Sequence, residues 1–185
     1  MGITFSELRD HVKIAHYFYY YTGGHFTTLS ALPDYQASNI AMKRSEYSIE
    51  TIRLLQFQHL LHRHRIEVYL PPGYYRNRLA RYRVLYANDG QDMSRLQLKE
   101  TLERLLEENR IVPVIVVAIH ASNDRLQEYG VYGIPDAHGR GSRAHLYSHY
   151  LTNRVMPYIE RKYRVMHGAR YTAFLGASQI GRAHV

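Results

Sequence analysis

The sequence contains no cysteine, so it can form neither a disulfide framework nor a metal site built from thiolates. Long apolar runs are also missing, since no stretch approaches the ~20 apolar residues that a membrane-spanning helix needs. Residues 1–32 hold no uninterrupted apolar segment of the kind that a secretory signal requires, because histidines and glycines interrupt it. We therefore expect a cytoplasmic protein with no membrane partner.

Acidic residues are scarce relative to basic ones. The chain has 24 Lys and Arg against 16 Asp and Glu, which gives a formal net charge of +8. A positive charge can indicate nucleic-acid binding, but here the basic residues are scattered through predicted helices and loops. The tyrosine-rich segment 17–21 lacks the ordered glycine and basic residues of an RNA-binding strand, which favours packing. We expect no nucleic-acid partner.

The middle of the chain alternates between two hydrophobic periods. Strands are predicted at residues 66–70, 82–87, 111–119 and 171–175, and amphipathic helices at 96–106 and 146–163, the second interrupted at Met156 and Pro157. The run at 111–119 is almost entirely Val and Ile, which is typical of a parallel strand covered on both faces. Strands that alternate with helices predict an α/β fold with a mostly parallel sheet and flanking helices.

The two ends of the chain are less regular than its middle. Residues 1–50 show no sustained period, and we interpret them as an N-terminal extension ahead of a domain at residues 51–178. The first strands are expected near residues 51–61. A strand followed by Gly176-Ala177-Ser178 is typical of a nucleophile turn, which needs very small residues two positions before and two after the serine. Gly176 meets this need and Ile180 does not, so we expect residues 179–185 to be a non-native tail.

Five motifs occur along the chain in a fixed order. They are VYLPPGY (68–74), VLYANDGQD (84–92), HASNDRLQEY (120–129), MPYIE (156–160) and GAS (176–178). Together they resemble the "Putative esterase" family of α/β-hydrolases, which includes esterase D, enterochelin esterase and feruloyl esterase. The resemblance covers roughly residues 60–178, and several ordered motifs are more specific than any single one.

The resemblance implies the N-terminal portion of an α/β-hydrolase fold and a serine carboxylic ester hydrolase that acts on a small-molecule ester. Ser178 would be the nucleophile that forms the acyl-enzyme, and the turn at Gly90 and Gln91 would help to build the oxyanion hole. The family pattern is GxSxGG, of which only the first half is present here. The triad carboxylate and histidine follow the serine in these enzymes. No base is therefore assigned, and we expect the chain as given to be inactive.

Polar residues follow the apolar run at 111–119, at the sheet edge where open α/β folds bind ligands. Asn123, Asp124, Arg125 and Glu128 are predicted to form the rim of the active site. Arg125 and Glu128 are three residues apart, which is close enough to pair on a helical turn. A charged brace that orders the rim is favoured over direct contact with an acidic or polar substrate. None of these residues is expected to be catalytic.

Other interpretations concern the histidines and the reaction. His62 and His64 have arginines beside them, so they suit a solvated strand edge better than a metal site. We expect no metal and no cofactor. The same fold also serves acyl transfer and thioester hydrolysis. A non-catalytic binding or carbohydrate-associated module, in which the triad is lost, is the alternative to an enzyme.

Overall fold

The computed structural model of the chain describes residues 46–53, 60, 62–130 and 134–176. Its strands are β1 (Ser48–Arg53), β2 (Arg65–Leu70), β3 (Arg83–Asn88), β4 (Val114–Ile119) and β5 (Thr172–Leu175). Its helices are α2 (Leu98–Glu107), α3 (Arg125–Glu128), α4 (Ala144–Tyr150) and α5 (Met156–Lys162), with 3₁₀ turns η1 (Gly90–Asp92) and η3 (Ala169–Tyr171) and a π-helical turn η2 (Leu151–Val155). The predicted α/β architecture is confirmed.

Three of the predicted strands match the structure to within one residue at each end. The fourth, predicted at 111–119, begins at Val114, because Pro113 has no N–H to donate to a ladder. β1 begins at Ser48, so the domain boundary expected after residue 50 falls inside a strand. Residues 1–45 and 177–185, including Ser178, lie outside the described part.

The five strands form one mixed sheet in the order β1-β2-β4-β3-β5. β2 is antiparallel to β1 and β4, whereas β3 is parallel to β4 and β5. The connections explain these directions. Residues 71–82 join β2 to β3 without a helix and the two strands run oppositely, whereas α2 carries the chain back between β3 and β4, as parallel neighbours require. Parallel pairing between strands is therefore confined to β4, β3 and β5, and one further parallel bridge joins Tyr82 to Val165.

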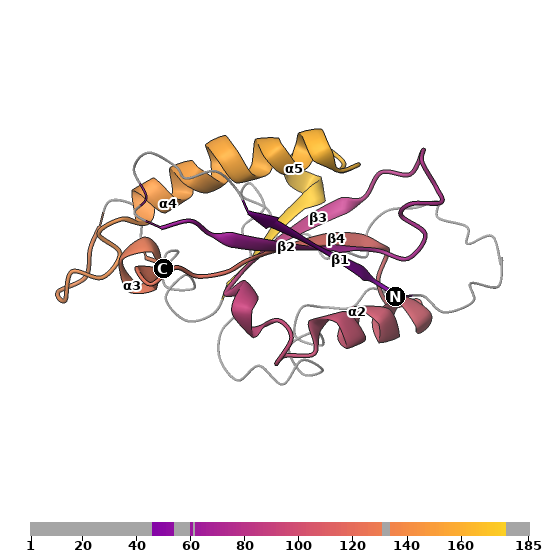
Figure 1. Ribbon diagram of the computed structural model, residues 1–185, viewed down its shortest axis with the longest axis horizontal. Helices are drawn as coiled ribbons and strands as arrows, with labels where there is room; N and C mark the ends of the chain where they lie inside the picture. Colours follow the sequence, from indigo (N-terminus) through magenta and orange to yellow (C-terminus); the bar gives the residue numbers. More distant parts are fainter. Residues whose placement is uncertain (1–45, 54–59, 61, 131–133, 177–185) are drawn as a thin grey trace.

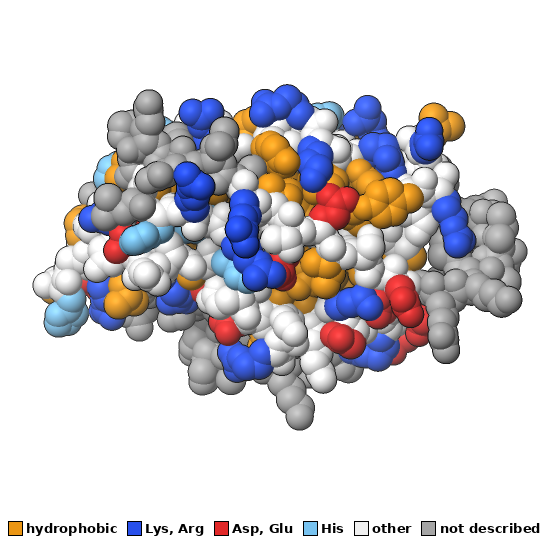
Figure 2. Space-filling model, in the orientation of Figure 1, with side chains coloured by type: hydrophobic (Ala, Val, Ile, Leu, Met, Phe, Trp, Pro, Cys, Tyr) orange, Lys and Arg blue, Asp and Glu red, His pale blue; other side chains and the backbone are white. Residues whose placement is uncertain are grey.

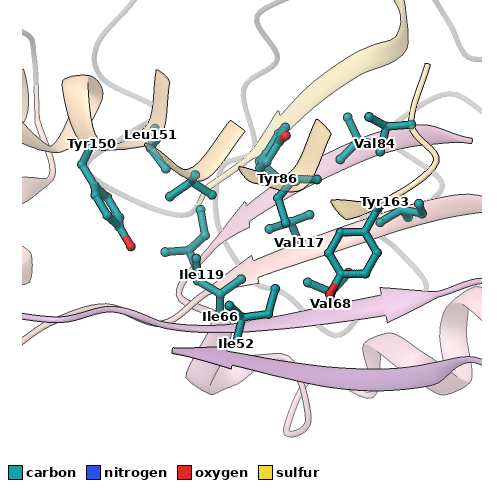
Figure 3. Packing of buried hydrophobic residues seen from close by; sticks show 14 of the residues in the cluster. Ile52, Ile66, Val68, Val84, Tyr86, Val117, Ile119, Tyr150, Leu151 and Tyr163 are labelled. Carbon is teal, nitrogen blue, oxygen red and sulfur yellow. The ribbon is translucent and has the colours of Figure 1, made fainter. Parts of the chain in front are cut away.

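Helices cover both faces of the sheet. Figure 1 shows α2 on one face and the run from α4 to α5 on the other. The strand side chains alternate between these faces, so the core divides into two clusters. Val117 and Ile119 belong to the cluster under α4 and α5, and Val116 and Ala118 belong to the cluster under α2. Figure 3 shows Tyr150, Leu151 and Tyr163 in the first cluster, among the strand side chains.

The predicted interruption of the second helix is a change of helical form rather than a break. The π-helical turn η2 lies between α4 and α5, and Pro157 occupies the first turn of α5. Proline has no N–H for the helical ladder, which accounts for the irregular turn before it.

On the face shown in Figure 2, basic side chains do not gather into one patch. In Figure 2, Lys and Arg side chains are spread across the visible face, with acidic and apolar groups between them. Among the described residues, no helix is long and apolar enough to span a membrane.

Candidate active site

The turn after β3 lies directly against the end of β4. A Cβ atom added to Gly90 would lie 2.8 Å from Cδ2 of His120 and 2.9 Å from the carbonyl oxygen of Ala118. Both distances are far below van der Waals contact, and the second involves backbone that cannot move aside. Only glycine therefore allows this turn to pack against β4.

Two backbone N–H groups of this turn take no part in the hydrogen bonds of η1. The N–H of Asp92 bonds to the carbonyl of Asp89 at 2.9 Å, and the N–H of Met93 bonds to that of Gly90 at 3.2 Å. Within the described part of the chain, no hydrogen bond uses the N–H of Gly90 or of Gln91. These are the first two amides of η1, which a helical turn leaves without an internal acceptor. They therefore have no acceptor among the described residues.

The strand that precedes Ser178 lies beside β3. In this parallel pair Ala87 is opposite Leu175, and Tyr86 is opposite Phe174. The chain therefore leaves both strands at the same edge of the sheet, next to the turn at Gly90. Gly176, the last described residue, is buried there.

Of the four predicted rim residues, Arg125 pairs with a residue of the turn. Its Nε donates to Oδ1 of Asp89 at 2.6 Å, and its Nη2 donates to Oδ2 at 2.7 Å. These hydrogen bonds raise the pKa of Arg125 above its ordinary value, against the effect of burial. The expected pairing with Glu128 is wrong: α3 is a single turn, and it directs the two side chains to different partners.

The other rim residues differ in burial and in their partners. Asp124 is partly buried and accepts a 2.5 Å hydrogen bond from Nη1 of Arg143. His62 is 3.7 Å from the same carboxylate. Asn123 is exposed. This side of the rim is therefore held by the ion pair between Asp124 and Arg143, which does not reach the turn at Gly90.

A buried histidine and carboxylate lie behind the rim. His64 and Glu128 are 2% and 1% exposed, so the expectation of a solvated edge is wrong for His64. Nδ1 of His64 is 2.8 Å from the carbonyl of His120, and Nε2 is 3.4 Å from Oε2 of Glu128. Since a carbonyl only accepts, Nδ1 carries a proton. The Nε2 contact is then attractive only when a second proton lies between the two groups.

Glu128 has a second partner in the loop after β4. The hydroxyl of Ser122 donates to Oε2 of Glu128 at 2.8 Å. Burial raises the pKa of Glu128, but the interactions with His64 and Ser122 outweigh it, and the pKa is lowered overall. The cluster ties the residues before β2 to α3. Nothing in the local sequence indicates it, because His64 and Glu128 are far apart in the chain.

Tyrosines from the α4 side contact the residues before Gly90. The hydroxyl of Tyr147 donates to Oδ1 of Asn88 at 2.5 Å, and the hydroxyl of Tyr129 accepts from the N–H of Asp89 at 3.4 Å. Burial raises the pKa of Tyr147 well above its ordinary value, so it stays protonated and donates. Tyr129 is the last residue of the motif at 120–129, whereas no motif in the sequence indicated Tyr147.

No group of three or more potential metal ligands occurs among the residues that the structure describes. Near the turn, the carboxylate of Asp89 instead accepts hydrogen bonds from Arg125 and Gln91. What the arrangement offers chemically is a pair of backbone donors at the carboxyl edge of the sheet.

Comparison with solved structures identifies the class of fold. A ferulic acid esterase matches with a TM-score of 0.58 at 24% identity, over 73% of this chain and 52% of that one. A ferulic acid esterase of Anaeromyces mucronatus matches with a TM-score of 0.50 at 20% identity, over 84% and 57%. The chain has the α/β-hydrolase fold, and it spans about half the length of these structures.

The family follows from the sequence. The model of the "Putative esterase" family matches residues 58–183, which is more than half of the chain, so the chain belongs to this family. The matched range includes the turn at Gly90, the residues of α3 and Ser178. No curated protein gives a significant match.

Proposed function

We propose that this protein is a serine carboxylic ester hydrolase that acts through an acyl-enzyme on Ser178. The observation that supports it most is the membership of a family of esterases over residues 58–183. The substrate would be a small-molecule ester.

Ser178 would attack the carbonyl carbon of the ester, and the carbonyl oxygen would become an oxyanion. In the proposed site the N–H groups of Gly90 and Gln91 would hold this oxygen, together with the N–H of residue 179. Expulsion of the alcohol leaves the acyl-enzyme, which water then hydrolyses. The base and its carboxylate follow the nucleophile in the chain order of α/β-hydrolases, so no described residue is given either role.

The rim residues have a structural role in this proposal. Arg125 braces the turn through Asp89, and Asp124 is braced by Arg143. Glu128 holds the loop after β4 through Ser122. None of these side chains takes part in bond making.

A covalent probe tests the nucleophile directly. Trypsin cleaves after Arg170, so in the longest product of the gene Ser178 lies in the peptide that begins at Tyr171. We expect a fluorophosphonate to label this peptide in the longest product of the gene. The Ser178→Ala variant should lose the label, and its kcat for 4-nitrophenyl acetate or ethyl ferulate should fall by roughly 10⁶-fold.

The control is Ser142→Ala, which alters an exposed serine before α4 and should keep both label and turnover. Normal turnover by Ser178→Ala would overturn the proposal. Binding of an ester without label or turnover in the wild type would favour the non-catalytic module.

A further inference from the structure

The residue before Gly90 has an unusual backbone conformation. Asp89 has φ 58° and ψ 45°, in the left-handed region. A residue with a Cβ atom pays roughly 1–2 kcal/mol to adopt this region. Aspartate adopts this region more readily than most residues because its short side chain can hydrogen-bond nearby groups. The contacts of its side chain and its amide hold Asp89 in this conformation.

Those contacts come mainly from Arg125 and from Tyr129, which packs against its guanidinium. Both carboxylate oxygens of Asp89 accept from the guanidinium, in the two-point geometry that fixes direction as well as distance. The guanidinium lies 4.9 Å from the ring centre of Tyr129, whose hydroxyl accepts from the amide of Asp89. The Asp89 side chain is 7% exposed, so water screens the pair weakly.

The same carboxylate also orders the residue after Gly90. Nε2 of Gln91 donates to Oδ1 of Asp89 at 3.2 Å. Oε1 of Gln91 accepts from the N–H of Ala121 at 2.9 Å, which ties the turn to the loop after β4. Both residues that flank Gly90 are thus connected to one guanidinium.

We propose that Arg125 is a positioning residue that acts through Asp89 to aim the N–H groups of Gly90 and Gln91 at the oxyanion. This inference rests on the proposed esterase function. Donors that are already aligned stabilise the oxyanion without reorganisation during the reaction. Without the guanidinium, Asp89 loses its anchor and the turn can relax toward ordinary dihedral angles. The ester would still bind, but the amides would meet the oxygen poorly.

The first readout is the kinetics of Arg125→Gln. We expect kcat for 4-nitrophenyl acetate to fall by roughly 10–100-fold, by analogy with the loss of an oxyanion donor, while KM changes little. Arg125→Lys keeps the charge but not the two-point geometry, and it should recover only part of the loss. The matched control is Arg143→Gln, which removes a similar ion pair at the same rim without touching the turn.

The second readout separates positioning from a structural role. Sulfur accepts hydrogen bonds weakly, so a thionoester gains little from the oxyanion donors. The rate ratio of 4-nitrophenyl acetate to 4-nitrophenyl thionoacetate should fall in Arg125→Gln and stay at the wild-type value in Arg143→Gln. General loosening of the fold would slow both esters equally.

An unchanged rate ratio in Arg125→Gln, or equal kinetic losses in the two glutamine variants, would overturn the inference. If Arg125→Gln does not fold, the rate ratio of the two esters is measured in Arg125→Lys instead, and an unchanged ratio in that variant would overturn the inference. Ser178→Ala separates the two proposals. Full activity in that variant refutes the esterase mechanism, whereas an inactive Ser178→Ala with an unaffected Arg125→Gln refutes only the role of Arg125.

Discussion

The two faces of the sheet are packed with different chemistry. Under α2 the buried cluster is mostly aliphatic, with Tyr47 and Tyr69 as its tyrosines. Under α4 and α5 the buried cluster contains Tyr74, Tyr82, Tyr86, Tyr129, Tyr147, Tyr150 and Tyr163. Each buried tyrosine brings a hydroxyl that needs a partner.

The tyrosines of the cluster under α4 and α5 also affect the candidate active site. Tyr129 and Tyr147 find their partners in the residues just before Gly90, so the aromatic face supports the turn while it fills the core. On the aliphatic face, the hydroxyls of Tyr47 and Tyr69 bond to Val114 and Glu67, away from the turn. If this division holds, substitutions on the two faces should separate stability from activity.

The largest effect on stability is expected on the aliphatic face. Leu102 of α2 is 3% exposed, and Leu102→Ala should lower the free energy of unfolding by about 3 kcal/mol through lost burial and a cavity. Urea unfolding measures the loss. The kcat of the folded variant should equal that of the wild type. A large fall in kcat would show that this face also supports the site.

A smaller loss of stability but a larger effect on activity is expected from Tyr147→Phe. The variant removes the 2.5 Å hydrogen bond to Asn88 and leaves that buried oxygen unpaired, which costs roughly 1–3 kcal/mol. The turn at Gly90 loses support, so kcat should fall. If kcat is unchanged while stability falls, the tyrosine only fills space.

Local sequence patterns predict the elements well because hydrophobic period is a local property. The strands at 66–70 and 82–87 and the helix at 96–106 are confirmed within two residues. Side-chain partners are harder to predict because topology decides them. Spacing within α3 suggested that Arg125 and Glu128 pair, but the sheet order brings Asp89 and His64 to that helix instead. The burial of His64 could not be predicted for the same reason, because it depends on the order of the strands in the sheet.

Acid should weaken the aromatic face through Glu128. Its pKa in the folded protein is below the ordinary value of 4.5, so folding favours the ionised form. This contribution is therefore complete above pH 4.5 and is lost as the pH falls through the lower folded value. The groups facing the carboxylate are His64, Ser122 and, more distantly, His62, Tyr147 and Tyr150.

Urea unfolding of the wild type and Glu128→Gln, followed from pH 5 to pH 3, tests this expectation. Other carboxylates titrate in both proteins, so the difference between the two curves isolates Glu128. The free energy of unfolding should fall more steeply with acid in the wild type. Parallel curves would contradict the lowered pKa.

The smallest effect on stability is expected at Glu50, a carboxylate that has several hydrogen-bond partners but is more exposed to solvent than Glu128. Glu50 of β1 accepts from Tyr75 at 2.5 Å, from Tyr163 at 2.7 Å and from Lys162 at 3.1 Å. The side chains of Lys162 and Glu50 are 42% and 31% exposed, so solvent screens their attraction. Lys162→Met should therefore cost less than about 1 kcal/mol, and 0.5 M NaCl should shrink even that difference. Urea unfolding at two salt concentrations measures both. If Lys162→Met lowers the free energy of unfolding as much as Tyr147→Phe does, then the number of partners of Glu50, and not its burial, determines how much its interactions stabilise the fold.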